Sequence, residues 1–349
     1  MPRRLEDRPP PPSTEASRLQ AMAEAAAQEG DTSTALAHYD ALLPVLAAES
    51  GPRWVDALRR VGTLHRARGE TTEADWWYRR SQEEAERMGY TNGVAHATNW
   101  LAVIAVRRGN TEIAEAQFAR AAELAAETRD ARLLSMIEQN LGVLANIRGD
   151  LDTALHCYEC ALDACRELDD ADMLASILNN VGVLNTQLSQ WPRAAESFIE
   201  ALDVARRAGL QALVNSIELN VAELDAKRER WPAAAAVSRE AARIARTQHN
   251  RWGEAEALRI SGMTARHQGQ LAEAERTLTR AAVLAADCQD RLLEAQVCRE
   301  LGETHAASGR HVEARASLTH ALELFRLVGA TLDVAALEQR LVEALQRTV

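Results

Sequence analysis

The sequence predicts an all-α solenoid. Three observations lead to this prediction: one pattern recurs every 40 residues without insertion or deletion, small residues recur at helical spacing, and aromatic residues make up only 4% of the chain. In a solenoid each unit packs against its neighbours, so close helix contacts through small residues replace a large aromatic core. A β-rich domain does not fit this composition.

The segment 141–161 shows the repeat unit most clearly. Gly142 lies on a first helix, where the missing side chain lets another helix come close. Gly149 ends this helix, because glycine readily takes the left-handed conformation found at helix C-termini. Ala154 and Tyr158 then lie four residues apart on one face of a second helix. The unit is therefore a hairpin of two helices.

The pattern keeps its register in seven copies. Its turn glycine is replaced by Ser189 and Glu229, and its bulky residue by Ser238. The columns are the small residue of the first helix (62, 102, 142, 182, 222, 262, 302), the turn residue (69, 109, 149, 189, 229, 269, 309), the alanine of the second helix (74, 114, 154, 194, 234, 274, 314), the bulky residue (78, 118, 158, 198, 238, 278, 318) and a second small residue (81, 121, 161, 201, 241, 281, 321).

These columns resemble the tetratricopeptide repeat, which has Leu-Gly on its first helix and Ala, an aromatic residue and Ala on its second. The resemblance covers roughly residues 17–345. A period of 40 is similar to the longer repeats of kinesin light chains, Pins-type polarity adaptors and bacterial peptide-sensing regulators. The tryptophan common early in the first helix is absent, as at Leu58 and Thr98, so no subfamily is assigned.

The resemblance implies a right-handed superhelix of about eight helical hairpins followed by a capping helix. We expect a disordered, proline-rich tail over residues 1–16, eight repeats over 17–333 and the capping helix over 334–349. The first repeat is atypical, since its markers Gly30 and Ala35 precede those of the second by 39 residues rather than 40.

Charge and composition exclude several classes of partner. The net charge of −11 disfavours nucleic acid and an anionic membrane surface, both of which attract clustered lysine and arginine. No apolar run is long enough for membrane insertion, and none follows the N-terminal arginines as a signal peptide requires. Five cysteines without framework spacing indicate a reducing compartment. We expect a cytoplasmic protein, and the alanine- and arginine-rich usage suggests a bacterial source.

The candidate binding residues lie on the first helices, which line the concave wall in solenoids of this kind. One column there holds Asn140, Asn180 and Asn220 in three consecutive repeats. An asparagine side chain offers an acceptor and two donors, so it can bond both the N–H and the C=O of a peptide. The resemblance implies this role for the three asparagines. The alternative is that they bond one another or a neighbouring carbonyl between helices.

Other residues on the same helix face would complete the groove. Trp100, in the asparagine column, could stack on a bound side chain, and apolar residues would form pockets. Arg60 and Arg107 could receive an acidic stretch or a terminal carboxylate, although a solvated helix face is an equally good interpretation. The remaining groove candidates are His96, Met136, Val143, Ile147, Val183 and Gln187.

The sequence carries no motif typical of a catalytic or cofactor site. Phosphate-binding loops, nucleophile elbows and zinc-protease motifs are absent. Cys157, Cys160 and Cys165 lie on a regular second helix, where packing is a better interpretation than zinc binding. Because the repeats account for residues 17–345, we expect no enzyme, no cofactor and no metal.

The expected function is a scaffold that binds a peptide segment of a partner protein in its concave groove. One alternative is a regulatory sensor of a short signalling peptide that acts through a separate effector. Another is a self-assembling structural protein, in which the cap or the tail of one copy docks into the next. The sequence does not distinguish an extended from a helical ligand.

Overall fold

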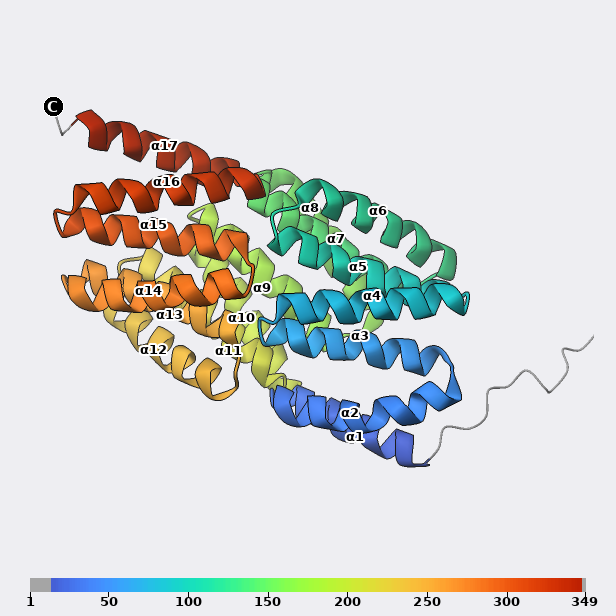
Figure 1. Cartoon of the computed structure of the whole chain (residues 1–349). Helices are drawn as coiled ribbons and strands as arrows, with labels where there is room; N and C mark the ends of the chain where they lie inside the picture. Colours follow the sequence, from blue (N-terminus) through green and yellow to red (C-terminus); the bar gives the residue numbers. More distant parts are fainter. Residues whose placement is uncertain (1–13, 347–349) are drawn as a thin grey trace, which may run out of the picture.

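The computed structural model describes residues 14–346, with the side chains of residue 167 and residues 342–346 left aside. Over residues 14–346 the chain forms seventeen α-helices and no strand, which confirms the predicted all-α fold (Figure 1). The expected tail falls mostly on residues 1–13, which lie outside the described part. Its last three positions, from Thr14, belong to the first helix.

Eight helical hairpins are followed by a single helix. The first helices of the hairpins are α1 (Thr14–Gln28), α3 (Pro52–Ala67), α5 (Thr91–Arg107), α7 (Ala131–Arg148), α9 (Ala171–Gln187), α11 (Gln211–Lys227), α13 (Arg251–His267) and α15 (Arg291–Ala307). The second helices are α2 (Thr32–Glu49), α4 (Thr71–Arg87), α6 (Thr111–Thr128), α8 (Leu151–Leu168), α10 (Trp191–Arg207), α12 (Trp231–Thr247), α14 (Leu271–Asp287) and α16 (His311–Val328). The single last helix is α17 (Thr331–Gln346).

The first helices form the inner wall of the superhelix. Consecutive first helices contact one another from α3 to α15, whereas consecutive second helices do not do so to a comparable extent. The second helices therefore lie outside, as in other solenoids of helical pairs. Figure 1 shows the hairpins stacked side by side around the superhelix.

The repeated glycine of the first helix packs against the bulky residue of the second. A Cβ added to Gly142 would lie 2.6 Å from Cε1 of Tyr158, and one added to Gly182 would lie 2.5 Å from Cε1 of Phe198. Tyr158 is in turn buried to 1% exposure. The two columns are coupled, since a larger residue at the glycine position would push the ring out of the core.

The turns keep their geometry where glycine is replaced. Ser189 and Glu229 have φ of 57° and 61°, in the same left-handed region as Gly149 at 81°. An L-residue there costs about 1 kcal/mol, which the rest of the hairpin sustains. The 40-residue pattern thus reports backbone conformation even in copies that lack the glycine.

The superhelix also closes on itself after about five repeats. The backbone N–H of Arg251, which begins α13, donates to the carbonyl of Arg68 at the end of α3, with an N···O distance of 3.1 Å. The hydroxyl of Thr71 donates to the carbonyl of Cys288 at 2.5 Å. Residues more than 180 positions apart are therefore neighbours, and Figure 1 shows α3 and α4 close to the ends of α13 to α15.

These contacts continue along a line that we call the seam. It joins the turns at residues 66–72, 107–109 and 147–149 to the segments 251–252, 288–290 and 327–332. At its far end the hydroxyl of Thr331 donates to the carbonyl of Arg148 at 2.5 Å, and α17 contacts α7. The seam therefore joins repeats of the N-terminal half to repeats that lie about five positions later in the array.

Candidate ligand groove on the inner helices

The asparagine column does lie along the inner helices, and two of its members are already hydrogen-bonded. Nδ2 of Asn140 donates to Oδ1 of Asn99 at 3.1 Å, and Nδ2 of Asn220 donates to Oδ1 of Asn179 at 2.8 Å. Each bond joins an inner helix to the inner helix of the preceding repeat. This is the interhelical bonding that the alternative interpretation described.

Asn180 differs from its neighbours in the column. It makes no side-chain hydrogen bond with any described residue and is half-buried on α9. The position that pairs with it by analogy, one before the column in the preceding repeat, holds Gln139 instead of an asparagine. Asn180 therefore has its full bonding capacity left for a ligand.

The paired asparagines also keep bonding capacity. Each of Asn140 and Asn220 uses one N–H of its amide, so an acceptor oxygen and a second N–H remain. The bond to the buried Asn99 or Asn179 fixes the rotation of the outer amide. We did not predict Asn99 and Asn179 from the sequence, although their place directly before the column was a signal for it.

Trp100 lies on the inner wall but its ring is already engaged. The ring stacks on Tyr78 with a centroid distance of 6.0 Å, and Cζ of Arg66 stands 4.7 Å from its centroid. A ligand side chain would have to displace Arg66 to reach that face. The expected stacking role of Trp100 is not favoured by this geometry, because the ring belongs to the packing of α3, α4 and α5.

His96 and Met136 are held by neighbouring repeats. Nε2 of His96 lies 3.1 Å from Oδ2 of Asp130, the residue that caps α7. Burial and the charge of Arg59 lower the pKa of His96 from 6.5 to about 4, despite the opposing effect of Asp130. The imidazole is therefore neutral near pH 7. The sulfur of Met136 accepts a bond from Nδ2 of Asn99 at 3.4 Å.

The expected apolar pockets are reproduced only in part. Val143 and Val183 are half-buried on the inner helices, and Gln187 is exposed at the end of α9. Ile147 instead packs against the hydrophobic cluster of the last repeat and α17, which includes Leu337. The position near the end of α7 places Ile147 in the seam rather than in a pocket.

The two candidate arginines occupy different places. Arg60 is partly exposed on α3, with Nη2 3.4 Å from Oε1 of Glu24. Arg107 lies in the seam, with Nε 3.9 Å from Oδ2 of Asp290 and Cζ 5.6 Å from the ring centroid of Trp252. Burial and the charge of nearby Arg66 lower the pKa of Arg107. Only Arg60 of the two is placed to meet a ligand without opening the seam.

A buried charge cluster lines the C-terminal half of the inner wall. Arg259 is 2% exposed, and its Nη2 lies 2.6 Å from Oε2 of Glu223 and 2.5 Å from Oε1 of Glu256. Burial tends to raise the pKa of Glu223, but the charges of Arg259 and Lys227 and the hydrogen bond from Arg259 together outweigh this effect, and the pKa is lowered. The cluster ties α11 to α13.

Further ion pairs extend this cluster. Nη2 of Arg266 lies 2.9 Å from Oε2 of Glu300, and Nη1 of Arg299 lies 2.5 Å from Oδ1 of Asp333. The repeat pattern did not predict these pairs, because each joins residues 34 positions apart that belong to different columns of the pattern. The charges of Arg259, Arg266 and Arg299 are therefore matched within the protein.

No metal or membrane site emerges from the described residues. Cys157 is buried and Cys160 exposed on α8, and no three His, Cys, Asp or Glu side chains in this part of the chain come together as metal ligands. None of the helices over residues 14–346 combines the length and apolar character needed to cross a bilayer.

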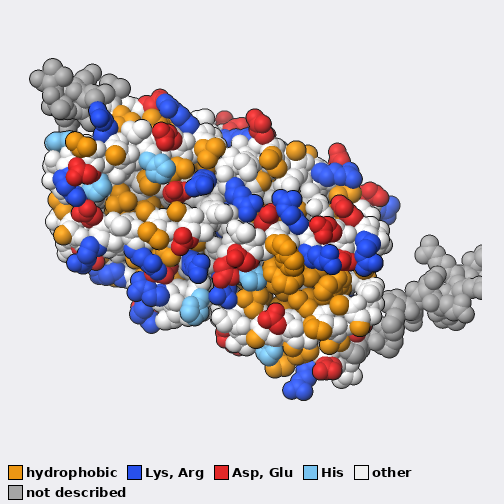
Figure 2. Space-filling view, in the orientation of Figure 1, with side chains coloured by type: hydrophobic (Ala, Val, Ile, Leu, Met, Phe, Trp, Pro, Cys, Tyr) orange, Lys and Arg blue, Asp and Glu red, His pale blue; other side chains and the backbone are white. Residues whose placement is uncertain are grey.

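The face seen in Figure 2 carries a marked hydrophobic area. Figure 2 shows hydrophobic side chains gathered over α3 and α4 on a face that otherwise mixes both charges. Trp76 is 57% exposed there and meets Trp77 edge to face, with a centroid distance of 4.7 Å. This area lies outside the asparagine column.

Comparisons with known proteins agree with the repeat analysis. A family model described as tetratricopeptide repeat matches residues 130–207, which hold the two hairpins α7–α8 and α9–α10. A comparison with curated proteins found no significant match.

Two solved structures share the architecture. NprR in complex with its cognate peptide NprX has a TM-score of 0.58 and 13% identity, over 82% of this chain and 80% of that one. A Rap protein complexed with competence and sporulation factor has a TM-score of 0.55 and 13% identity, over 96% of this chain and 99% of that one. The family match shows tetratricopeptide repeats over residues 130–207, and the two structures show that the described chain shares the fold of such repeat proteins.

Proposed function

We propose that this protein is a non-enzymatic scaffold that binds a peptide segment of another protein along its inner helices. Asn140, Asn180 and Asn220 would hold the peptide backbone, and Val143 and Val183 would contact its side chains. The observation that carries this proposal is the column of asparagines with unused bonding capacity, above all Asn180, whose side chain bonds none of the described residues.

Two further features support a binding role. Hydrogen bonds to Asn99 and Asn179 orient Asn140 and Asn220 before any ligand arrives, which lowers the entropy cost of binding. The similar solved structures include one complexed with its cognate peptide and one complexed with competence and sporulation factor. Helical repeats occupy residues 14–346, and repeats of this kind are typically used for binding.

The seam favours a second candidate, a sensor of a short peptide that acts through a separate effector. A ligand on the inner wall contacts helices from several repeats and so prefers one superhelical pitch. The seam is the element that a change of pitch would break or tighten, because it joins residues about five repeats apart. A sensor shifts between such states only if its ligand binds them with different affinity.

Affinity capture from the source cell tests the scaffold function. The native protein is compared with the variant Asn140→Ala, Asn180→Ala, Asn220→Ala. The matched control is Asp163→Ala, Asp203→Ala, Arg243→Ala, which changes three exposed outer-helix residues of the same repeats at the same spacing. We expect a protein that the native form and the control retain and the asparagine variant loses.

Other outcomes would redirect the proposal. Equal retention by all three proteins would move the interaction to another surface, such as the area around Trp76. Displacement of a captured protein by a short peptide would favour the sensor. Each variant must first show the native helical spectrum and a cooperative thermal transition, so that loss of binding is not loss of folding.

A further inference from the structure

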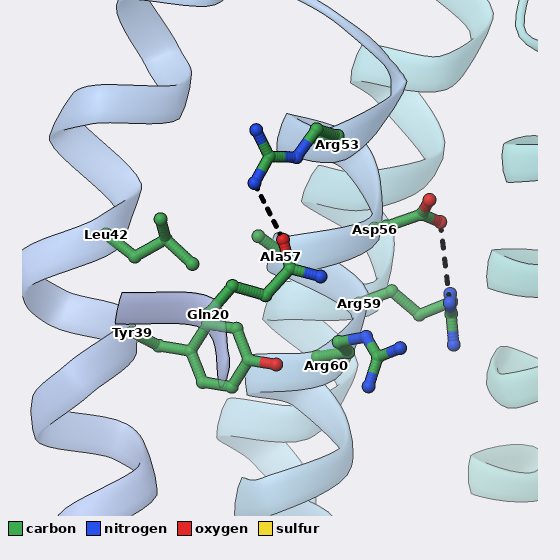
Figure 3. A pocket seen from close by; sticks show the side chains of 8 residues that line it. All are labelled: Gln20, Tyr39, Leu42, Arg53, Asp56, Ala57, Arg59 and Arg60. Carbon is green, nitrogen blue, oxygen red and sulfur yellow. Dashed lines mark hydrogen bonds and ion pairs between the residues drawn. The ribbon is translucent and has the colours of Figure 1, made fainter. Parts of the chain in front are cut away.

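A small hollow lies among α1, α2 and α3, at the N-terminal end of the inner wall. Its volume is about 80 Å³. Figure 3 shows the polar side chains that surround it, with the Gln20 amide turned toward Arg53, the Tyr39 hydroxyl near the helix that carries Arg60, and Arg59 paired with Asp56. The polar residues of the lining are Gln20, Tyr39, Arg53, Asp56, Arg59 and Arg60.

Positive charge dominates this lining. It has three guanidinium groups and one carboxylate, that of Asp56, whose Oδ1 lies 3.4 Å from Nη2 of Arg59. Arg53 donates from Nη2 to Oε1 of Gln20 at 2.9 Å, and its Nη1 is 3.6 Å from Glu49 outside the hollow. Buried Nη1 of Arg53 and Nε of Arg59 have no acceptor within hydrogen-bond distance. Leaving buried donors unsatisfied is costly, so these two groups favour the arrival of an additional acceptor.

The Tyr39 hydroxyl adds another donor. Burial raises the pKa of Tyr39, and the positive charge of Arg60 only partly opposes this effect. The hydroxyl therefore keeps its proton at neutral pH. Guanidinium forks together with a hydroxyl match the acceptor geometry of a carboxylate or a phosphate.

We propose that this hollow binds one oxyanion group, a carboxylate or a phosphate, carried by the ligand of the inner groove. Arg60 supplies the main contact, and Tyr39, Arg53 and Arg59 complete the donor set. The inference rests on the proposed function for its ligand. Arg60 stands in the same repeat column as Asn140 and Asn180, so the oxyanion anchors the end of a ligand whose backbone follows that column.

Glu24 of α1 holds the place of this oxyanion in the free protein. Its Oε1 accepts a bond from Nε2 of Gln20 at 3.0 Å and lies 3.4 Å from Nη2 of Arg60. Both side chains of this ion pair are partly exposed, so the pair is weak and exchangeable. Glu24 therefore competes with the ligand and lowers its affinity.

A titration of the whole chain with inorganic phosphate and, separately, with acetate at constant ionic strength tests the site. Binding is followed by nuclear magnetic resonance of the arginine Nε–H groups. We expect saturable shifts of Arg53, Arg59 and Arg60. Arg60→Gln should weaken binding at least about tenfold, the value of one charged hydrogen bond. Glu24→Gln should strengthen it, because the competing charge is gone.

Arg79→Gln is the matched control, since Arg79 is exposed on α4 and does not line the hollow. Its Nε lies 3.1 Å from Oδ2 of Asp75. It removes the same charge and should leave affinity unchanged. Saturation by phosphate alone would assign the site to a phosphate group, and saturation by both probes would extend it to carboxylates.

Absence of saturation by both probes, or equal weakening by Arg60→Gln and Arg79→Gln, would overturn the proposal. Neither probe needs the peptide ligand. Failure of the oxyanion site is therefore separate from failure of the groove, which capture by the asparagine variants tests.

Discussion

Gly69 and Cys288 touch across the seam, although about five repeats separate them in the chain. A Cβ on Gly69 would stand 2.5 Å from Sγ of Cys288 and 3.0 Å from the backbone N of Trp252. Gly269 occupies the equivalent turn five repeats on, has the same φ of +77°, and has nothing within 4 Å of its Cβ position. Both glycines adopt the left-handed turn, but only Gly69 is also in close contact with another segment of the chain.

This pair gives a matched test of the seam. Gly69→Ala and Gly269→Ala should carry the same left-handed strain, about 1 kcal/mol each. Only Gly69→Ala should also push the two sides of the seam apart. We expect a larger radius of gyration by small-angle X-ray scattering for Gly69→Ala alone, and a larger loss of unfolding free energy. Identical scattering and stability for both variants would show that the seam is not a closed contact in solution.

The buried charge cluster around Arg259 predicts a strong effect on stability. Replacing Arg259 by Met leaves Glu223 and Glu256 without their cation in a buried site, and should reduce the unfolding free energy by about 3–5 kcal/mol. Arg243→Met is the control, because Arg243 pairs with Glu240 on the exposed face of α12. That change should have little effect on urea unfolding. A loss for Arg259→Met no larger than for the control would contradict the cluster's stabilising role.

His96 predicts a particular dependence of stability on pH. Its pKa is lowered from 6.5 to about 4 in the folded protein, so the unfolded chain binds the proton more readily between these values. The contribution of neutral His96 is therefore complete above pH 6.5 and is lost as the pH falls toward 4. In His96→Gln the unfolding free energy should fall less between pH 7 and pH 5, by about 2 kcal/mol.

Urea titrations at both pH values measure this difference, and titrating groups that do not contact His96 cancel in the comparison. The native protein and the variant losing stability in parallel would mean that His96 is solvated and titrates normally.

The repeat pattern predicted the hairpins because their contacts are local in sequence. Gly142 meets Tyr158 only sixteen positions later, and both residues recur in register. The seam could not be predicted in this way. It depends on the superhelical pitch, which sums small rotations over about five repeats, and the sequence pattern constrains each rotation only loosely. Ile147 and Arg107 were expected on the groove face of their helices, but their position near the helix end brings them to the seam.

The candidate site was predicted by residue type and register but not by bonding. The column of Asn140, Asn180 and Asn220 is readable because asparagine repeats at one position. Whether each amide bonds a neighbour depends on the residue one position before the column, which is Asn99 or Asn179 in two cases and Gln139 in the third. The hollow near Arg60 was out of reach because the atypical first repeat supplies Gln20 and Tyr39.

Asn180 offers the most direct test of groove binding, because its side chain makes no hydrogen bond within residues 14–346 that its removal would break. The measurement is the dissociation constant of the captured partner for the native protein and for Asn180→Ala, together with the unfolding free energy of each. We predict an affinity about tenfold lower, one hydrogen bond to a buried backbone group, with unchanged stability. An unchanged dissociation constant, with the partner still bound, would contradict a peptide held along the asparagine column.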